Sequence, residues 1–273
     1  MTLLQSLIIA ILQGATELFP VSSLGHAVLL PGLLHWNIDQ QAQDFLPFLV
    51  MLHLGTAAAL LAYFWRDWFG FASAVLGRGD SLVVRRERRV FRLVCAATLP
   101  ACLLGFVLEH RLRELFGAPA LAAAFLIVNG VILFVGERIK HAGAKTLDQV
   151  DFGAALVIGA CQALALIPGI SRSGATMVGG VVAGLTHKEA ARFSFLLATP
   201  VIAGAGMLEV PKMLKAHVSL DMMTVLIAGL AAGATAYLST ALLMRYFKHN
   251  EGGALTPFAV YCWLAGALAL VLL

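Results

Sequence analysis

Six apolar stretches are long enough to cross a lipid bilayer as helices, and they constrain the fold more than any other feature. They run over residues 45–64, 91–108, 119–136, 193–210, 223–244 and 256–273. At about 1.5 Å per residue, a helix of about 20 residues spans a hydrocarbon core of about 30 Å. Only 12% of the residues are charged, whereas a soluble domain carries about a quarter. The sequence therefore predicts an all-α polytopic membrane protein with six transmembrane helices.

Two further apolar segments are interrupted near their middle. Residues 3–34 are broken at Pro20-Val-Ser-Ser-Leu-Gly25, and residues 152–186 at Pro168-Gly-Ile-Ser-Arg-Ser-Gly174. Each arm is short for a full crossing, and irregular backbone at membrane depth needs protein or a water-filled cavity to satisfy its polar groups. We expect both segments to be re-entrant helical hairpins.

The distribution of Lys and Arg favours this topology. With both hairpins re-entrant, 14 basic residues lie on one side, led by Arg85, Arg86, Arg88 and Arg89, and 4 on the other: Arg111, Arg113, Lys212 and Lys215. If both segments crossed fully, the split would fall to 12 against 6. The positive-inside rule then places the basic side in the cytoplasm and both termini opposite it. The net charge of +4 comes from these connecting segments, which predicts contact with anionic membrane lipids and no nucleic-acid partner.

An internal repeat supports the same arrangement. AILQGATELFPVSS, at residues 10–23, resembles GACQALALIPGISRS at residues 159–173. We expect a single integral membrane domain, 1–273, built from an inverted-topology repeat. Repeat 1 covers about 1–136 with hairpin 3–34, and repeat 2 about 151–273 with hairpin 152–186. The two broken tips would meet near the midplane, where folds of this kind bind their substrates.

Ionisable residues inside membrane segments are functional candidates, and Glu17, His26 and Arg172 stand out. The guanidinium of Arg172 offers a bidentate fork for phosphate oxygens. The neighbouring hydroxyls and the start of a new helix add donors for an anion; this group comprises Ser171, Ser173, Gly174 and Thr176. Alternatively, Arg172 pairs with Glu17 and holds the two repeats together.

Glu17 follows Gln13 by four residues, so both face the same side of a helix. The two oxygen-bearing side chains could hold Mg²⁺ or Ca²⁺ if a pyrophosphate supplied the remaining ligands. A glutamine carries no charge, so Glu17 would have to provide most of the metal binding. Glu17 could instead act as a general base.

Ser22, Ser23 and His26 form the turn of the first hairpin. A serine three residues before a histidine can lie beside it, which is the minimum for an activated nucleophile. The same residues are also common as helix caps and buried donors. His53 is equally compatible with a place in the cavity and in the core, whereas Asn129 and Glu137 are expected to serve helix packing and a helix end.

These residues resemble the undecaprenyl-pyrophosphate phosphatase family of bacterial inner membranes, the bacitracin-resistance proteins. That family is marked by an (E/Q)xxxE motif running into Pro-x-Ser-Ser-x-Gly-His, and by PGxSRSxxT. The matching positions here are 13–17, 20–26 and 168–176, and the likeness extends over the whole chain.

The resemblance implies hydrolysis of undecaprenyl pyrophosphate to undecaprenyl phosphate, which recycles the lipid carrier for peptidoglycan synthesis and confers bacitracin resistance. It also implies Mg²⁺ or Ca²⁺ as cofactor. The functional set that it implies is Glu17, Ser23, His26, Ser171, Arg172, Ser173 and Thr176. As a mechanism we expect Ser23 to attack the terminal phosphorus, with His26 or Glu17 as base; a metal-bound water is the alternative nucleophile. A lipid-carrier flippase or an anion transporter is the alternative function, and a homodimer the expected assembly.

Overall fold

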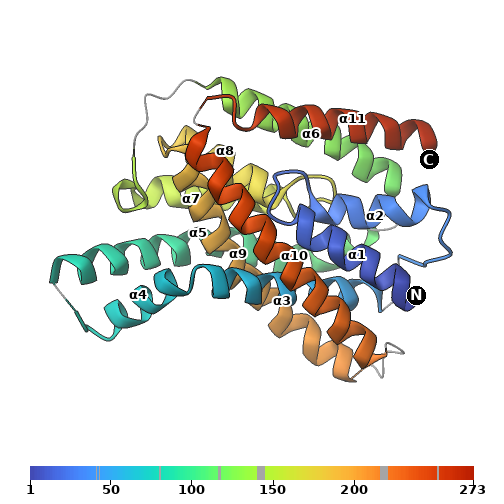
Figure 1. Ribbon diagram of the computed structural model, residues 1–273, viewed down its shortest axis with the longest axis horizontal. Helices are drawn as coiled ribbons and strands as arrows, with labels where there is room; N and C mark the ends of the chain where they lie inside the picture. The colour runs from blue at the N-terminus through green and yellow to red at the C-terminus, as the bar shows by residue number, and fades with distance from the viewer. Residues whose placement is uncertain are drawn as a thin grey trace.

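The computed structural model describes residues 1–40, 42, 44–79, 81–115, 118–139, 145–215, 221–250 and 252–273; the side chains of 81, 109–115 and 212–215 are excepted. Eleven α-helices and one 3₁₀ helix, η1 (Leu147–Gln149), make up these ranges, which contain no β-strand (Figure 1). The predicted all-α class is confirmed. The side chains of Arg111, Arg113, Lys212 and Lys215 lie outside the described part.

In the part of the chain that the structure describes, five helices are long and apolar enough to cross a membrane. They are α3 (Phe45–Tyr63), α5 (Ser81–Leu115), α6 (Pro119–Arg138), α9 (His187–Lys215) and α10 (Met222–His249). The sixth predicted segment forms α11 (Thr256–Leu272), which has 17 residues and falls just short of that length. The chain is a multi-pass helical membrane protein.

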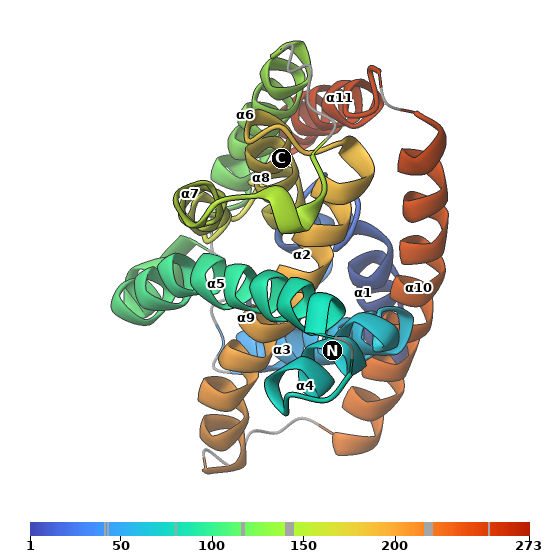
Figure 2. The ribbon, with the colours of Figure 1, turned by 90° about the vertical axis from the view of Figure 1, so that its left-hand side faces the viewer.

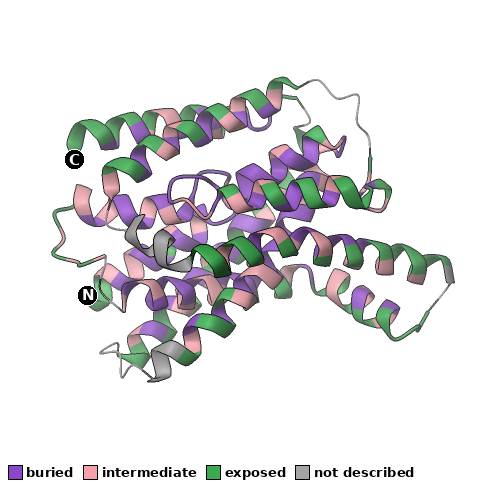
Figure 3. Ribbon diagram, turned by 180° about the vertical axis from the view of Figure 1, so that it is seen from behind, coloured by how far each residue is buried: buried purple, intermediate pink, exposed green. Residues whose placement is uncertain are grey.

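The outward faces of the long helices are apolar. Phe106 and Val107 on α5 are 66% and 74% exposed, and Leu230 on α10 is 74% exposed. Figure 3 shows such exposed residues along the outer helices, with buried residues gathered in the interior. A surface of this kind is stable only against lipid or another apolar partner.

The two interrupted segments are pairs of short helices joined by irregular loops. The first pair is α1 (Leu3–Thr16) and α2 (Ser23–Leu33), and the second is α7 (Phe152–Leu164) and α8 (Arg172–Val182). Each second helix begins at a capping serine: Ser22 accepts a hydrogen bond from the Gly25 N–H, and Ser171 accepts one from the Gly174 N–H. Both helices therefore resume inside the stretches predicted to be irregular, at Ser23 and Arg172.

Both breaks lie in the middle of the molecule. Figure 1 shows the N-terminus, the C-terminus and the end of α2 on one side, and α4 (Trp65–Val75) with the start of α5 on the other. Seen from the α4 side, α2 and α8 lie centrally, with α6 and α11 above them and α10 along one flank (Figure 2). The two loops thus come together inside the helical bundle.

Small residues allow the supporting helices to pack closely. A Cβ on Gly55 of α3 would lie 2.1 Å from the Gly229 carbonyl oxygen of α10, and one on Gly14 of α1 would lie 2.3 Å from the Ala232 oxygen. Helices in membranes associate largely through such close contacts, because lipid removes the hydrophobic driving force between them.

Helix α4 was not predicted, since residues 65–92 read as a connecting segment. Three arginines of the basic run that follows α4 bond to other parts of the protein. Arg88 donates through Nε and Nη2 to the Ala74 carbonyl at the end of α4. Arg89 donates to the Val150 carbonyl, and Arg86 lies 3.0 Å from Asp148. The expected lipid contact of this run therefore applies to its exposed members, such as Arg85.

Candidate active site

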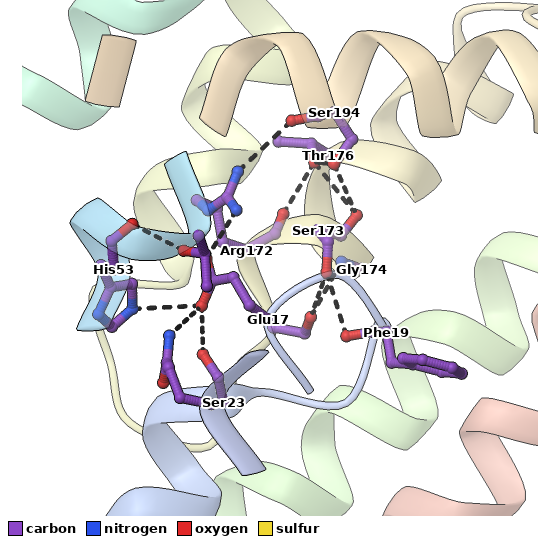
Figure 4. A network of polar contacts seen from close by, with 12 residues as sticks. Glu17, Phe19, Ser23, His53, Arg172, Ser173, Gly174, Thr176 and Ser194 are labelled. Carbon is purple, nitrogen blue, oxygen red and sulfur yellow. Dashed lines mark hydrogen bonds and ion pairs between the residues drawn. The ribbon is translucent and has the colours of Figure 1, made fainter. Parts of the chain in front are cut away.

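Glu17 is the centre of the polar cluster formed by the two breaks. It caps the C-terminus of α1 and is only 6% exposed. Its Oε2 accepts hydrogen bonds from Ser23 Oγ at 2.5 Å and from Gln13 Nε2 at 2.8 Å, and lies 3.2 Å from His53 Nε2 (Figure 4). A buried carboxylate needs such partners, because an unpaired charge at this depth costs several kcal/mol.

Arg172 approaches Glu17 from the second break. Its Nη2 donates to Glu17 Oε1 at 2.8 Å, and its Nη1 donates to the Ser194 carbonyl of α9 at 3.4 Å. Arg172 is the first residue of α8, so the positive end of that helix dipole lies in the same region. The predicted convergence of Glu17 and Arg172 is thus observed, as is the alternative in which they form an ion pair.

The remaining polar residues of the second break face inward. Thr176 Oγ1 bonds to the Arg172 carbonyl at 2.8 Å and to Ser194 Oγ at 2.7 Å. Ser173 Oγ lies 3.0 Å from Ser171 Oγ and donates to the Phe19 carbonyl of the first break at 3.2 Å (Figure 4). These hydroxyls therefore join the two loops to each other and to α9.

His26 is the residue whose predicted place the structure corrects. Its Nδ1 lies 2.7 Å from the Ser22 carbonyl oxygen, and its Nε2 lies 2.8 Å from the hydroxyl of Tyr261 on α11. The three-residue spacing therefore does not produce a Ser23–His26 pair, because both residues lie on α2 and the imidazole turns back along that helix. Glu17 is the acceptor of the Ser23 hydroxyl instead.

A cavity of about 340 Å³ opens beside this cluster. Its polar lining comprises Glu17, Ser22, Ser23, His53, Ser171, Arg172 and Glu209. The rest is mostly apolar and comes from α2, α3, α5, α9 and the second break, with Leu49, Phe106 and Ile202 among the lining residues. Gln13, His26, Ser173, Gly174 and Thr176 do not line it. Ser173 and Thr176 are 0% and 1% exposed and Gly174 is buried, and their contact with phosphate stays a prediction.

Sequence reasoning left two cavity residues unassigned. His53 contacts Glu17. The feature of the sequence that could have indicated this role is a histidine inside the apolar helix that follows the first break. Glu209, 6% exposed on α9, was overlooked although a carboxylate inside the apolar stretch 193–210 is itself a signal.

Two side chains offer oxygen ligands to a divalent cation. Among the residues that the structure describes, no group of three or more His, Cys, Asp and Glu is placed to hold a metal ion. Gln13 Oε1, however, is buried without a hydrogen-bond partner, next to the Glu17 carboxylate. Since Mg²⁺ is often held by one or two protein oxygens together with substrate phosphates, these residues fit a cation that arrives with phosphate.

The fold and the polar cluster define a multi-pass helical membrane protein whose buried carboxylate, hydroxyl and guanidinium meet between two broken helices, beside an apolar cavity. The chain belongs to the bacitracin resistance protein BacA family, whose model matches residues 6–268. An undecaprenyl-diphosphatase of Acidiphilium cryptum is 53% identical over 278 residues, covering 100% of this chain and 99% of the relative. Proteins of the same name from Granulibacter bethesdensis and Gluconobacter oxydans are 52% and 50% identical, covering 99% and 98% of this chain and 96% and 98% of their own.

Proposed function

We propose that the protein hydrolyses undecaprenyl diphosphate to undecaprenyl phosphate and phosphate. The observation that carries the proposal is the Ser23 hydroxyl, 2.5 Å from the Glu17 carboxylate that Arg172 also contacts. Ser23 as nucleophile, Glu17 as base and the Arg172 guanidinium as phosphate-binding group would thus act together beside a largely apolar cavity. The names of the relatives supply the substrate.

The proposed reaction begins with proton transfer from Ser23 Oγ to Glu17. Ser23 Oγ forms a bond to the terminal phosphorus, and the bond from that phosphorus to the bridging oxygen breaks, so undecaprenyl phosphate leaves. The departing undecaprenyl phosphate takes the proton from Glu17. Water then attacks the phosphoserine and Glu17 takes a proton from this water. The bond from phosphorus to Ser23 Oγ breaks as Glu17 returns the proton to Oγ, which releases phosphate. Direct attack of water on the terminal phosphorus, with the same base, is the alternative.

Arg172 binds the phosphate and stabilises the charge of the transition state. Its Nη2 donates a hydrogen bond to Glu17 and its Nη1 donates one to the Ser194 carbonyl, so the guanidinium is already oriented. His53 holds Glu17 Oε2 in place for Ser23. Ser22 and Ser171, whose side chains line the cavity, complete the phosphate site.

Glu17 and Gln13 are the residues that would hold Mg²⁺ or Ca²⁺. When bound, the cation would neutralise charge on the phosphate oxygens. Gln13 contributes through its unpartnered Oε1, which the Glu17 hydrogen bond leaves free.

The apolar cavity lining supports a lipid substrate. Phe106 lines the cavity and is 66% exposed on the outer surface, so the apolar wall extends from Arg172 to the lipid-facing side of the protein. The polyprenyl chain would follow this wall while its diphosphate reaches the polar cluster.

We further propose six transmembrane helices and two re-entrant hairpins in an inverted repeat, within the bacterial inner membrane. Support comes from the positions of the breaks and termini in Figure 1. The cavity is lined by residues 46–53 of α3, 101–106 of α5 and 201–209 of α9, which lie in the halves of these helices remote from Arg85 and Arg192. With the basic side cytoplasmic, the cavity opens toward the periplasm, where the released lipid carrier would re-enter the cycle of peptidoglycan synthesis. The exposed apolar belt would contact membrane lipids and, in a homodimer, a second copy.

The test is phosphate release from undecaprenyl diphosphate by the purified protein in detergent, with and without EDTA. We expect Arg172→Ala to lower the rate at least about a hundredfold, Arg172→Lys to restore only part of it, and the exposed Arg245→Ala to match the wild type. EDTA should abolish release, and Mg²⁺ should restore it. A wild type that binds the lipid without releasing phosphate would overturn the proposal in favour of a flippase or an anion transporter, which the names of the relatives do not favour.

A further inference from the structure

Catalysis at this site requires two loops from distant parts of the chain to keep one relative position. Ser23 follows the first loop and Arg172 the second, and the backbone hydrogen bonds within these loops are those of turns, such as Ile170 N–H to the Ile167 carbonyl. The Ser173 hydroxyl joins the two loops through the Phe19 carbonyl, and a neighbouring helix provides a further link. Helix α6 packs against both α2 and α8, which places it beside the two breaks.

Asn129 of α6 bonds to the backbone of both breaks. Its Nδ2 donates to the Pro20 carbonyl at 2.9 Å, and its Oδ1 accepts from the Ser171 N–H at 2.9 Å. The side chain is 0% exposed, and Nδ2 also lies 3.3 Å from Cys262 Sγ. The planar amide of Asn129 thus joins Pro20, three positions before Ser23, to Ser171, directly before Arg172.

The surrounding backbone leaves little freedom for the loops to adjust. Gly169 has φ +103°, and a Cβ at this position would lie 2.3 Å from the Ala122 carbonyl oxygen of α6. A Cβ on Gly25 would lie 3.0 Å from the Gly169 Cα, so the two breaks also touch each other. The loops are packed against α6 and against one another, and Asn129 adds a second hydrogen-bonded link to the one from Ser173 to the Phe19 carbonyl.

We infer that Asn129 is a positioning residue for the reaction: by holding Pro20 and Ser171 it sets the Ser23 hydroxyl and the Arg172 guanidinium at the separation that one phosphate requires. The inference rests on the proposed function. Asparagine suits this role because its amide presents one acceptor and two donors in a fixed plane. A shift of about 1 Å between reacting groups can cost about a hundredfold in rate.

Two substitutions test the inference. Asn129→Leu keeps the number and branching of the side-chain heavy atoms and removes both hydrogen bonds, so kcat should fall about a hundredfold while KM changes much less. Asn129→Asp keeps the acceptor for Ser171 but donates to the Pro20 carbonyl only when protonated. Because burial favours the neutral carboxyl, the activity of Asn129→Asp relative to the wild type should rise as pH falls from 8 to 6.

A control separates positioning from general destabilisation. Phe71→Leu removes buried packing in α4, away from the cavity, and should lower the melting temperature without lowering kcat. Equal kcat in Asn129→Leu and wild type would overturn the inference, and so would a pH-independent ratio for Asn129→Asp.

Hydrogen–deuterium exchange tests the link without any turnover. Asn129→Leu should accelerate exchange of the Ser171 amide and of the first break, but not of α10. Unchanged exchange would also overturn the inference. A wild type that releases no phosphate would refute the proposed function, while the exchange result would still decide whether Asn129 couples the two breaks.

Discussion

Arg172 Nη2 lies 2.8 Å from Glu17 Oε1, although 155 positions separate the two residues in the chain. The Glu17 side chain is 4% exposed and that of Arg172 13%, so each compensates a charge that would be costly alone. The pair also joins the two broken segments at the point where the Ser23 hydroxyl is bound. Glu17 and Arg172 therefore form both the ion pair that joins the two segments and part of the proposed reactive site.

Ser23→Ala should lower phosphate release at least about a hundredfold, because it removes the proposed nucleophile. Ser22→Ala should cost less, since the Ser22 hydroxyl caps α2 through the Gly25 N–H. The measurement is kcat for both variants, together with acid-quench mass spectrometry for a phosphoserine in residues 17–33. Near-normal turnover by Ser23→Ala would exclude the covalent mechanism and favour direct attack by water.

His53→Ala should lower kcat about 10- to 100-fold, because Glu17 loses the donor 3.2 Å from its Oε2. His53→Gln should recover part of this loss, since its amide can donate to the same oxygen. The exposed His249→Ala serves as the matched control and should leave kcat unchanged. Full activity of His53→Ala would remove His53 from the proposed site.

His26 should act through the backbone rather than by taking the Ser23 proton. His26→Asn places an amide where Nδ1 meets the Ser22 carbonyl, so it should retain at least about a tenth of the rate, whereas His26→Ala should lose more. Rates over a range of pH are the readout, because asparagine cannot act as a base. Equal inactivity of the two variants would restore His26 as a candidate base.

Gln13→Glu should strengthen metal binding by adding a second carboxylate beside Glu17. The Mg²⁺ concentration for half-maximal phosphate release should fall at least about threefold, and in Gln13→Leu it should rise, because ligand charge sets affinity. Gln5→Glu is the control, since it makes the same change on α1 near its N-terminus, where the side chain bonds to Thr2 and not to Glu17. An unchanged Mg²⁺ requirement in both Gln13 variants would show that Gln13 does not contribute to the metal site.

Arg88→Ala should lower the free energy of unfolding by about 1 kcal/mol, because the end of α4 loses a donor from a charged group at a partly exposed site. Arg85→Ala, on the same helix but exposed, should have a much smaller effect. Thermal unfolding in detergent measures both. If Arg88→Ala lowered kcat without lowering the free energy of unfolding, the contact between Arg88 and α4 would influence the reaction in the cavity instead of stability.

The sequence predicted the helical class and the positions of the long helices, because runs of apolar residues and their lengths carry this information directly. It also singled out Glu17 and Arg172, since charged residues inside apolar segments are costly and need partners. Helix α4 was missed because it lies in a segment whose charges match those of a loop. The close association of Ser23 with Glu17, six positions away, depends on how the chain turns at residues 17–22.

By itself, the sequence determined which residues must lie in lipid and where two apolar helices have to break, since both follow from local composition and the chemistry of Pro, Ser and Gly. Only the tertiary structure decided which polar groups meet. It directed Ser23 to Glu17 and turned His26 toward Tyr261. It also brought His53 and Asn129 from the long helices to the two breaks. The physical reason is that a helical spacing constrains neighbours within one element, whereas contacts between elements depend on packing that no local pattern records.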